Sequence, residues 1–282
     1  MSKQIRSLAE DPDNGKIRVN RRDILAATGA AALGILAFPL RWVAGAGKKK
    51  QKVLYFSRSA GYEHDAVKSK NGKPSISERI LNELGKKHGF EVDSTKDGRI
   101  FDGNLDQYDA IAFYTSGVLT MPNKQKTPPM TDEGKEKLLN AIAAGKGFVG
   151  LHSCTDSFHS RGPSNENQTE VDPYIAMLGG EFIVHGAQQN ATIRAASPAF
   201  PGVKEFGKSV SLKEEWYTLK NFAKDLHVIL IEDNEGMEGD CYQRPPFPMT
   251  WARMHNKGRV FYTSFGHRDD IWTNPAVQGI IA

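Results

Sequence analysis

In the first half of this sequence, short apolar runs alternate with segments of helical period, and this alternation limits the possible folds more than any other feature. Residues 53–56, 110–114 and 148–151 have the length and composition of buried strands. Residues 77–88 and 131–145 each place apolar side chains on one helical face. Strands joined by such helices require right-handed crossovers, so the pattern predicts a parallel sheet with ligand chemistry at the carboxyl ends of its strands.

The second half has a different pattern. It contains strand-like runs separated by turns, at residues 191–195, 210–219, 228–232, 249–254 and 259–264. Runs without helices between them predict an antiparallel extension of the sheet. We therefore expect one α/β domain with a layered sheet. The final residues are typical of the first turn of a further helix, as in a fragment of a longer chain.

An apolar run near the start, residues 24–40, is too short and too rich in Ala and Gly for a good membrane span. It directly follows Asn20-Arg21-Arg22-Asp23, an order typical of a twin-arginine export signal. We expect residues 1–46 to be this signal, 47–51 a basic linker and 52–282 the functional domain of a periplasmic or extracellular protein. An uncleaved amphipathic anchor is the alternative.

The charge balance argues against a nucleic-acid partner. The chain has 37 Lys and Arg against 33 Asp and Glu, and removal of the signal leaves 30 against 29. A net charge of +1 produces no extended basic field. We also expect no stable membrane span after removal of the signal, and no disulfide, because Cys154 and Cys241 are a single pair far apart in sequence.

Four histidines follow the ends of strand-like runs. They are His64, His152, His185 and His267. The ends of adjacent parallel strands lie about 5 Å apart, so these imidazoles are expected to meet in one crevice. Each of them, taken singly, is better explained by solvation or by local hydrogen bonds.

His152, Asp156 and His159 are spaced four and three residues apart, and a helix beginning after Leu151 would place them on one face. This spacing suits a metal or acid–base cluster. It equally suits a structural role, in which His152 bonds to the strand backbone and Asp156 caps the following helix.

A second group combines acids with aromatic side chains: Glu214, Glu215, Trp216, Tyr217 and, further along, Trp251. Carboxylates bind sugar hydroxyls and aromatic rings cover the apolar face of a pyranose, so this group predicts a carbohydrate site. The alternative is that the two tryptophans are core residues.

Several well-known catalytic motifs are absent from the sequence. Gly150-Leu151-His152 carries histidine where an α/β-hydrolase has its nucleophilic serine. No Gly-x-Gly-x-x-Gly follows the first strand, and there is no P-loop and no His-Glu-x-x-His. A Rossmann dinucleotide site is therefore not supported.

Read in order along residues 52–282, these motifs resemble the ThuA-like family, named for trehalose utilisation. The matching pieces are Gly61-Tyr62-Glu63-His64, Tyr108-Asp109, Gly150-Leu151-His152-Ser153 with Asp156, Gly179-Gly180-Glu181-Phe182 with His185, Glu214-Glu215 with Tyr217, Pro248 with Trp251, Gly258-Arg259-Val260 and Gly266-His267. The resemblance implies a flavodoxin-like layered sheet, as in the class I glutamine amidotransferases, without their cysteine nucleophile. It also implies a link to bacterial use of disaccharides, including routes through 3-keto sugars, and excludes glutamine hydrolysis.

We therefore predict an exported hydrolase, lyase or isomerase that acts on a sugar or an oxidised (3-keto) glycoside. The catalytic residues are expected to be His152 paired with Asp156, and Glu215. The substrate-binding residues are expected to be His64, His185, Tyr217, Trp251 and His267. No cofactor is certain. In one version of this prediction, His64, His185 and His267 hold a divalent metal ion together with Asp156. The alternative function is a non-catalytic carbohydrate-binding or scaffold domain, and the oligomeric state is left open.

Overall fold

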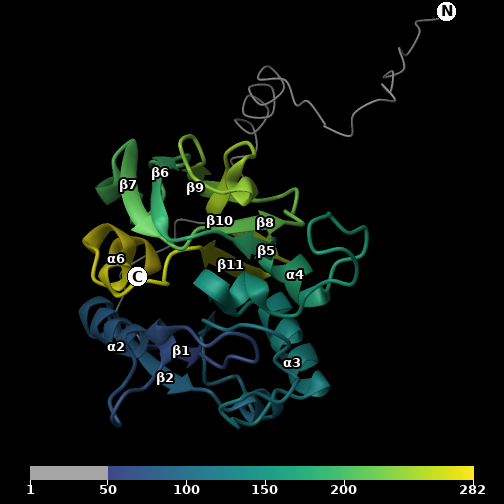
Figure 1. The fold of residues 1–282 in the computed structure, drawn as a ribbon. Coiled ribbons are helices and arrows are strands. Elements are labelled where there is room, and N and C mark those ends of the chain that lie inside the picture. Colours follow the sequence, from purple (N-terminus) through teal and green to yellow (C-terminus); the bar gives the residue numbers. More distant parts are fainter. Residues whose placement is uncertain (1–49) are drawn as a thin grey trace, which may run out of the picture. The chain divides into compact units, whose positions relative to one another are not determined.

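The described part of the chain, residues 50–282 of a computed structural model, is built on a nine-stranded sheet in the order β2-β1-β3-β4-β11-β10-β9-β6-β7 (Figure 1). The predicted export signal and the first three residues of the predicted basic linker, 47–49, lie outside these described residues. Within the described part, no helix combines the length and the apolar character needed to cross a membrane.

One half of the sheet is parallel, as predicted. Its strands are β1 (Gln51–Phe56), β2 (Phe90–Thr95), β3 (Ala110–Phe113), β4 (Gly147–Leu151) and β11 (Gly258–Thr263). Their carboxyl ends are nearly level, because Phe56 pairs with Phe113, and Leu151 pairs with Thr263. The loops that follow these strands therefore emerge at one edge of the sheet.

Two helices pack on opposite faces of this parallel half. α2 (Ile76–His88) begins with a capping box between Ser75 and Glu78, and its buried residues pack against the layer that contains Tyr55. α3 (Asp132–Ala143) is capped by Thr131, whose side chain accepts the N–H of Gly134, and packs in the other layer. The remaining helices are α4 (Pro173–Leu178), α5 (Asp269–Trp272) and α6 (Pro275–Ile281).

The other half of the sheet is antiparallel, which confirms the predicted extension. It consists of β10 (Phe247–His255), β9 (His227–Asp233), β6 (Gln189–Ala195) and β7 (Ser209–Glu214), with β10 paired to β11. A separate two-stranded sheet pairs β5 (Glu181–His185) with β8 (Tyr217–Lys220).

The prediction of one continuous strand over residues 210–219 is wrong, because the chain leaves the large sheet after β7 and enters the small one at β8. Two interactions stabilise this break. The carboxylate of Glu214 accepts the N–H of Glu215, and the fully buried ring of Trp216 donates its N–H to the carbonyl of Gln189. The break matters because Glu215 lies within it.

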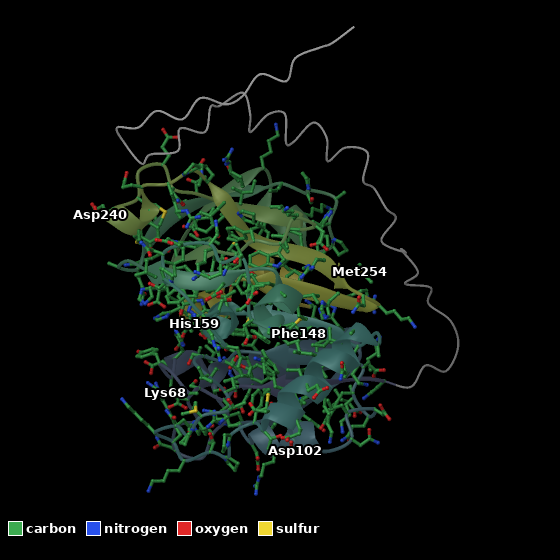
Figure 2. All side chains as sticks on the ribbon, turned by 90° about the vertical axis from the view of Figure 1, so that its right-hand side faces the viewer. Lys68, Asp102, Phe148, His159, Asp240 and Met254 are labelled. Carbon is green, nitrogen blue, oxygen red and sulfur yellow. The ribbon has the colours of Figure 1, made fainter. Side chains whose placement is uncertain are left out.

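The two ends of the parallel strands face opposite sides of the molecule. Lys68 and His159 belong to the loops that follow β1 and β4, and Figure 2 shows them on one side. Met254 lies near the turn that leads into β11, and it appears on the other side. Both cysteines are free thiols, with Cys154 buried and Cys241 partly buried.

The buried Glu232 of β9 gives a test of the packing. Neither of its carboxylate oxygens has a hydrogen-bond partner among the described residues, and burial raises its pKa to about 8 although Arg244 opposes the shift. The folded protein then holds a proton that the unfolded chain has released, so Glu232 lowers stability progressively as the pH rises from about 4.5 to about 8.

We expect Glu232→Gln to remove the loss of stability that Glu232 causes at higher pH. In thermal unfolding, the variant should match the wild type near pH 5 and exceed its Tm by several degrees near pH 8. The exposed Glu235, changed to Gln, is the control and should show no such pH-dependent gain. Equal Tm values for Glu232→Gln and wild type at both pH values would contradict an unpaired, protonated Glu232.

Candidate functional site

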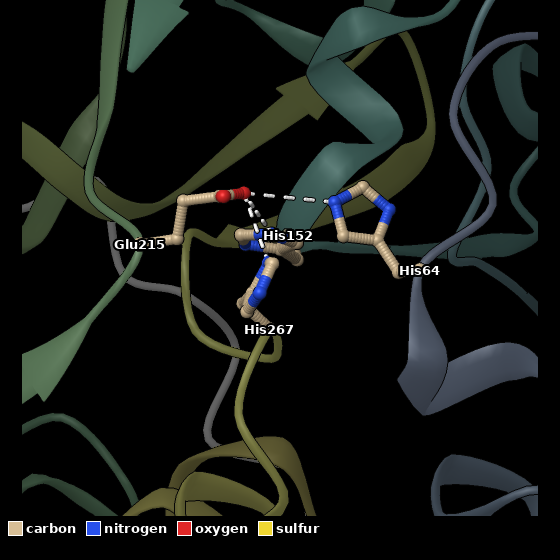
Figure 3. Close-up of side chains that lie close together, drawn as sticks. All are labelled: His64, His152, Glu215 and His267. Carbon is tan, nitrogen blue, oxygen red and sulfur yellow. Dashed lines mark ion pairs between the residues drawn. The ribbon is translucent and has the colours of Figure 1, made fainter. Parts of the chain in front are cut away.

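The carboxyl edge of the parallel strands carries three imidazoles that surround one carboxylate (Figure 3). His64 follows β1, His152 follows β4 and His267 follows β11, whereas Glu215 comes from the break between β7 and β8. One nitrogen of each histidine and one oxygen of Glu215 all lie within 4.8 Å of one another. We call these four residues the His–Glu cluster.

The distances converge on one atom, Glu215 Oε2. It lies 2.9 Å from His267 Nδ1, 3.5 Å from His152 Nε2 and 3.6 Å from His64 Nε2. Glu215 Oε2, His152 Nε2 and His267 Nδ1 are nevertheless buried without a hydrogen-bond partner among the described residues, so even the short contact lacks the alignment of a hydrogen bond. Buried polar atoms normally have partners, and three converging exceptions require an explanation.

His152 is held in a strained position. Its φ is +44°, in the left-handed region that side chains other than glycine rarely adopt, and its Nδ1–H donates to the carbonyl of Ser264 over 2.7 Å. This hydrogen bond leaves the proton on Nδ1 and the lone pair of Nε2 directed toward Glu215. The ring is fully buried, which suits a ligand more than a base that must reach substrate.

Glu214 joins two of the segments that build the cluster. Its carboxylate accepts the N–H of Glu215 over 2.8 Å and the N–H of Gly266 over 3.2 Å. Burial raises the pKa of Glu214 to about 7. Glu214 thereby positions Glu215 and the residue before His267, a role that sequence reasoning missed and that only its place beside Glu215 hinted at.

Burial and charge set the protonation of the cluster. Burial lowers the pKa of His152 to about 4 and also lowers that of His64. Burial opposes the ionisation of Glu215, but the three imidazoles outweigh it and hold its pKa well below the usual range. At His267 the effect of Glu215 exceeds that of burial and raises the pKa. Two neutral imidazoles and one carboxylate are therefore available as electron-pair donors.

Tyr217 and His185 lie against the cluster. The ring of Tyr217 lies with its centre 4.4 Å from the ring centre of His152, and it stacks on the ring of His185. The hydroxyl of Tyr217 lies 3.2 Å from His64 Nε2. Tyr217 is buried and supports the imidazoles. The His185 side chain is 40% exposed, lies 3.4 Å from Glu215 Oε1, and donates its Nδ1–H to the carbonyl of Gly186, which leaves its Nε2 free to accept a proton.

The predicted pairing of His152 with Asp156 is wrong. Asp156 lies 2.7 Å from His159 Nε2, and the other nitrogen of His159 lies 3.3 Å from Glu181. Asp156 and then Glu181 raise the pKa of His159 to about 9 against the effect of burial. The chain after Leu151 forms a short 3-10 helix, η4 (His152–Asp156), so residues four apart do not share a face as they would in an α-helix.

The prediction that Trp251 binds sugar is also not supported. Its ring is fully buried, donates its N–H to the carbonyl of Leu178 over 2.9 Å, and packs 4.3 Å from Tyr262. It is a core residue. The candidate metal ligands also differ from those expected. His64 and His267 are part of the cluster as expected, but the other two members are His152 and Glu215 instead of His185 and Asp156.

Two open hollows share Gln188 in their walls, and one of them also includes His267 of the cluster. One, of about 410 Å³, is lined by Asp65, Lys70, Gln188, His267, Arg268, Asp269 and Asp270. The other, of about 580 Å³, is lined by residues of the segments 186–190 and 236–239 with Lys213. Tyr62 is 64% exposed with its ring centre 4.9 Å from that of His64, and sequence reasoning missed it although it stands two residues before that histidine.

Taken together, the sheet order and the site define a flavodoxin-like α/β protein in which the carboxyl edge of the parallel strands carries imidazoles and a carboxylate. The chain belongs to the ThuA family, because the family model described as trehalose utilisation matches residues 52–282. This confirms the resemblance seen in the sequence and supports a sugar-related role.

Two solved structures have a similar fold. A ThuA-like protein from Bacteroides uniformis is 19% identical, with a TM-score of 0.61, and the match covers 85% of this chain and 92% of that one. A ThuA-like protein from Parabacteroides merdae is 14% identical, with a TM-score of 0.55, and the match covers 82% and 90%. A comparison with curated proteins finds no match.

Gly266 provides a test of how tightly the cluster is built. Its φ is +142°, and an added Cβ would lie 3.2 Å from the Cβ of His152. We expect Gly266→Ala to destabilise the protein by about 2–3 kcal/mol in urea unfolding, from backbone strain and crowding together. Gly89→Ala, at φ +85° with open space around it, should cost only about 1 kcal/mol. Equal costs would show that the His152 contact is unimportant.

Proposed function

We propose that this ThuA-family protein is an exported, metal-dependent enzyme that acts on a sugar or an oxidised (3-keto) glycoside at the His–Glu cluster. The observation that carries the proposal is the convergence of three buried, unpartnered polar atoms, those of Glu215, His152 and His267, on one point. Burying such atoms without partners is costly, and a cation between them would satisfy all three. Imidazole and carboxylate ligands suit Zn²⁺ and other divalent transition metals.

The surroundings of the cluster support a sugar substrate. The smaller hollow presents carboxylates, an amide and a guanidinium, groups that hydrogen-bond to hydroxyls, and His267 of the cluster forms part of its wall. At the side of His64, the exposed ring of Tyr62 offers an apolar surface of the kind that covers the C–H face of a pyranose. The family description, trehalose utilisation, agrees with a carbohydrate.

The proposed chemistry begins at the carbon beside the carbonyl of a 3-keto sugar, where the carbonyl acidifies the C–H bond. A bound divalent ion would supply polarisation of the carbonyl oxygen. His185 accepts the proton at Nε2, the nitrogen that its hydrogen bond to Gly186 leaves with a lone pair, while the C–H electron pair moves toward the carbonyl oxygen. Return of a proton to carbon completes an isomerisation. Breakage of the glycosidic C1–O bond, with protonation of the departing oxygen, completes an elimination.

Export is the part of the proposal that depends on the sequence alone. Arg21 and Arg22 precede a mildly apolar run, in the order of a twin-arginine signal. An exported sugar-modifying enzyme would meet its substrate outside the cytoplasm.

Metal analysis tests the centre. We expect the wild-type protein to retain about one divalent ion per chain after dialysis, as measured by elemental analysis. His152→Ala and Glu215→Gln should each weaken binding by more than the roughly 10–100-fold typical of a lost outer-shell partner. His159→Gln removes a histidine outside the cluster and should retain the ion. A wild-type protein that binds no Zn²⁺, Mn²⁺ or Fe²⁺ would refute the metal centre.

Turnover of defined substrates tests the chemistry. Glucosides and their 3-keto derivatives are incubated with the metal-loaded protein, and products are followed by NMR. We expect conversion of a 3-keto glycoside, and we expect His185→Gln to lower its rate by about 10²–10⁴-fold while metal content stays unchanged. His159→Gln is the matched control and should keep the wild-type rate. A glycoside that binds but remains unchanged would favour the non-catalytic binding domain instead.

A further inference from the structure

Gln188 contacts both His267 of the His–Glu cluster and Arg268, and all three residues line the smaller hollow. Its amide nitrogen is 2.9 Å from His267 Nε2, and its amide oxygen accepts a hydrogen bond of 2.9 Å from Arg268 Nη1. Arg268 is also held by both carboxylate oxygens of Asp270, at 2.9 and 3.1 Å. Gln188 is exposed and lines both hollows.

The chemistry of the amide determines the proton position on His267. A guanidinium only donates, so Arg268 requires the oxygen of Gln188, and the NH₂ group is left facing His267. The NH₂ group also only donates, so His267 Nε2 must accept and the ring proton must be on Nδ1. Nδ1 is the atom that faces Glu215, and in this tautomer it has no lone pair to offer a cation.

Cation binding reverses these requirements. His267 would bind the ion through Nδ1, so its proton would be on Nε2 and would need an acceptor. The Gln188 amide must then turn its oxygen toward His267, and Arg268 loses that oxygen. Nη1 of Arg268 is thereby released into the hollow, while the Arg268–Asp270 pair keeps the guanidinium in place.

We propose that Gln188 is a positioning residue that couples cation binding at the His–Glu cluster to the hydrogen-bonding state of Arg268 in the adjoining hollow. The coupling arises because the oxygen of Gln188 faces Arg268 while its NH₂ group faces His267, so turning the oxygen toward His267 takes it away from Arg268. It rests on the proposed metal centre. A sugar oxygen that accepts the released N–H of Arg268 would favour metal binding, since coupling between two sites is reciprocal.

Gln188→Glu tests the coupling directly. Glutamate has two accepting oxygens, so one can accept from His267 Nε2–H while the other accepts from Arg268, and metal binding no longer costs a hydrogen bond. Zn²⁺ affinity is measured on the full chain by competition with a chelator. We expect Gln188→Glu to bind Zn²⁺ at least about 10-fold more tightly than wild type, the range of other outer-shell effects.

The matched control for charge is Asn190→Asp. Asn190 is exposed two residues away, and its side chain makes no hydrogen bond to another residue of the described part. This variant adds the same negative charge without touching His267, so its affinity should stay close to that of wild type. Thermal unfolding of both variants checks that the fold is retained.

A second measurement determines which nitrogen of His267 carries the proton. Nitrogen-15 NMR of the histidine side chains should find the proton of His267 on Nδ1 in the metal-free wild type and on Nε2 in the wild type with Zn²⁺ bound. A proton on Nε2 in the metal-free wild type would overturn the proposal, as would equal Zn²⁺ affinities for Gln188→Glu and Asn190→Asp. Absence of Zn²⁺ binding by the wild type would overturn the metal centre itself, and the coupling with it.

Discussion

The site depends on one buried carboxylate, Glu215, around which imidazoles from three separate loops are arranged. A buried carboxylate is costly unless opposite charge or donors surround it, so the positions of His64, His152 and His267 are not independent of one another. The carboxylate comes from the antiparallel half of the sheet and the imidazoles from the parallel half. The contact between Glu215 and the imidazoles therefore connects the antiparallel half of the sheet to the parallel half.

The geometry of the parallel sheet brings these side chains together. Parallel strands of similar register end at one level, and His152 and His267 follow β4 and β11 by one and four residues, which keeps both close to the edge of the sheet. The strained backbone of His152 is maintained by its hydrogen bond to Ser264 and by the close approach of Gly266. Such preorganisation suits a site in which the side chains must already be in place when an ion or substrate arrives.

Sequence reasoning succeeded where a local pattern reports a regular element. The helices predicted over residues 77–88 and 131–145 are present as α2 and α3, and three of the four histidines expected to meet, His64, His152 and His267, do meet. It failed where the backbone departs from regular geometry. Asp156 was assigned to His152 by α-helical spacing, but in the 3-10 helix it pairs with His159 instead. Trp251 was assigned to substrate binding, but its ring is buried in the core.

By itself, the sequence determined the alternation of strands and helices, the parallel-then-antiparallel order and the family, because hydrophobic period and motif order are local properties of the chain. Only the tertiary structure decided which carboxylate the imidazoles share and that Gln188 connects the cluster to Arg268. These contacts join residues far apart in the chain. Which residues meet depends on how the strands pack and on where the chain breaks between β7 and β8, and a local sequence pattern contains no information about either.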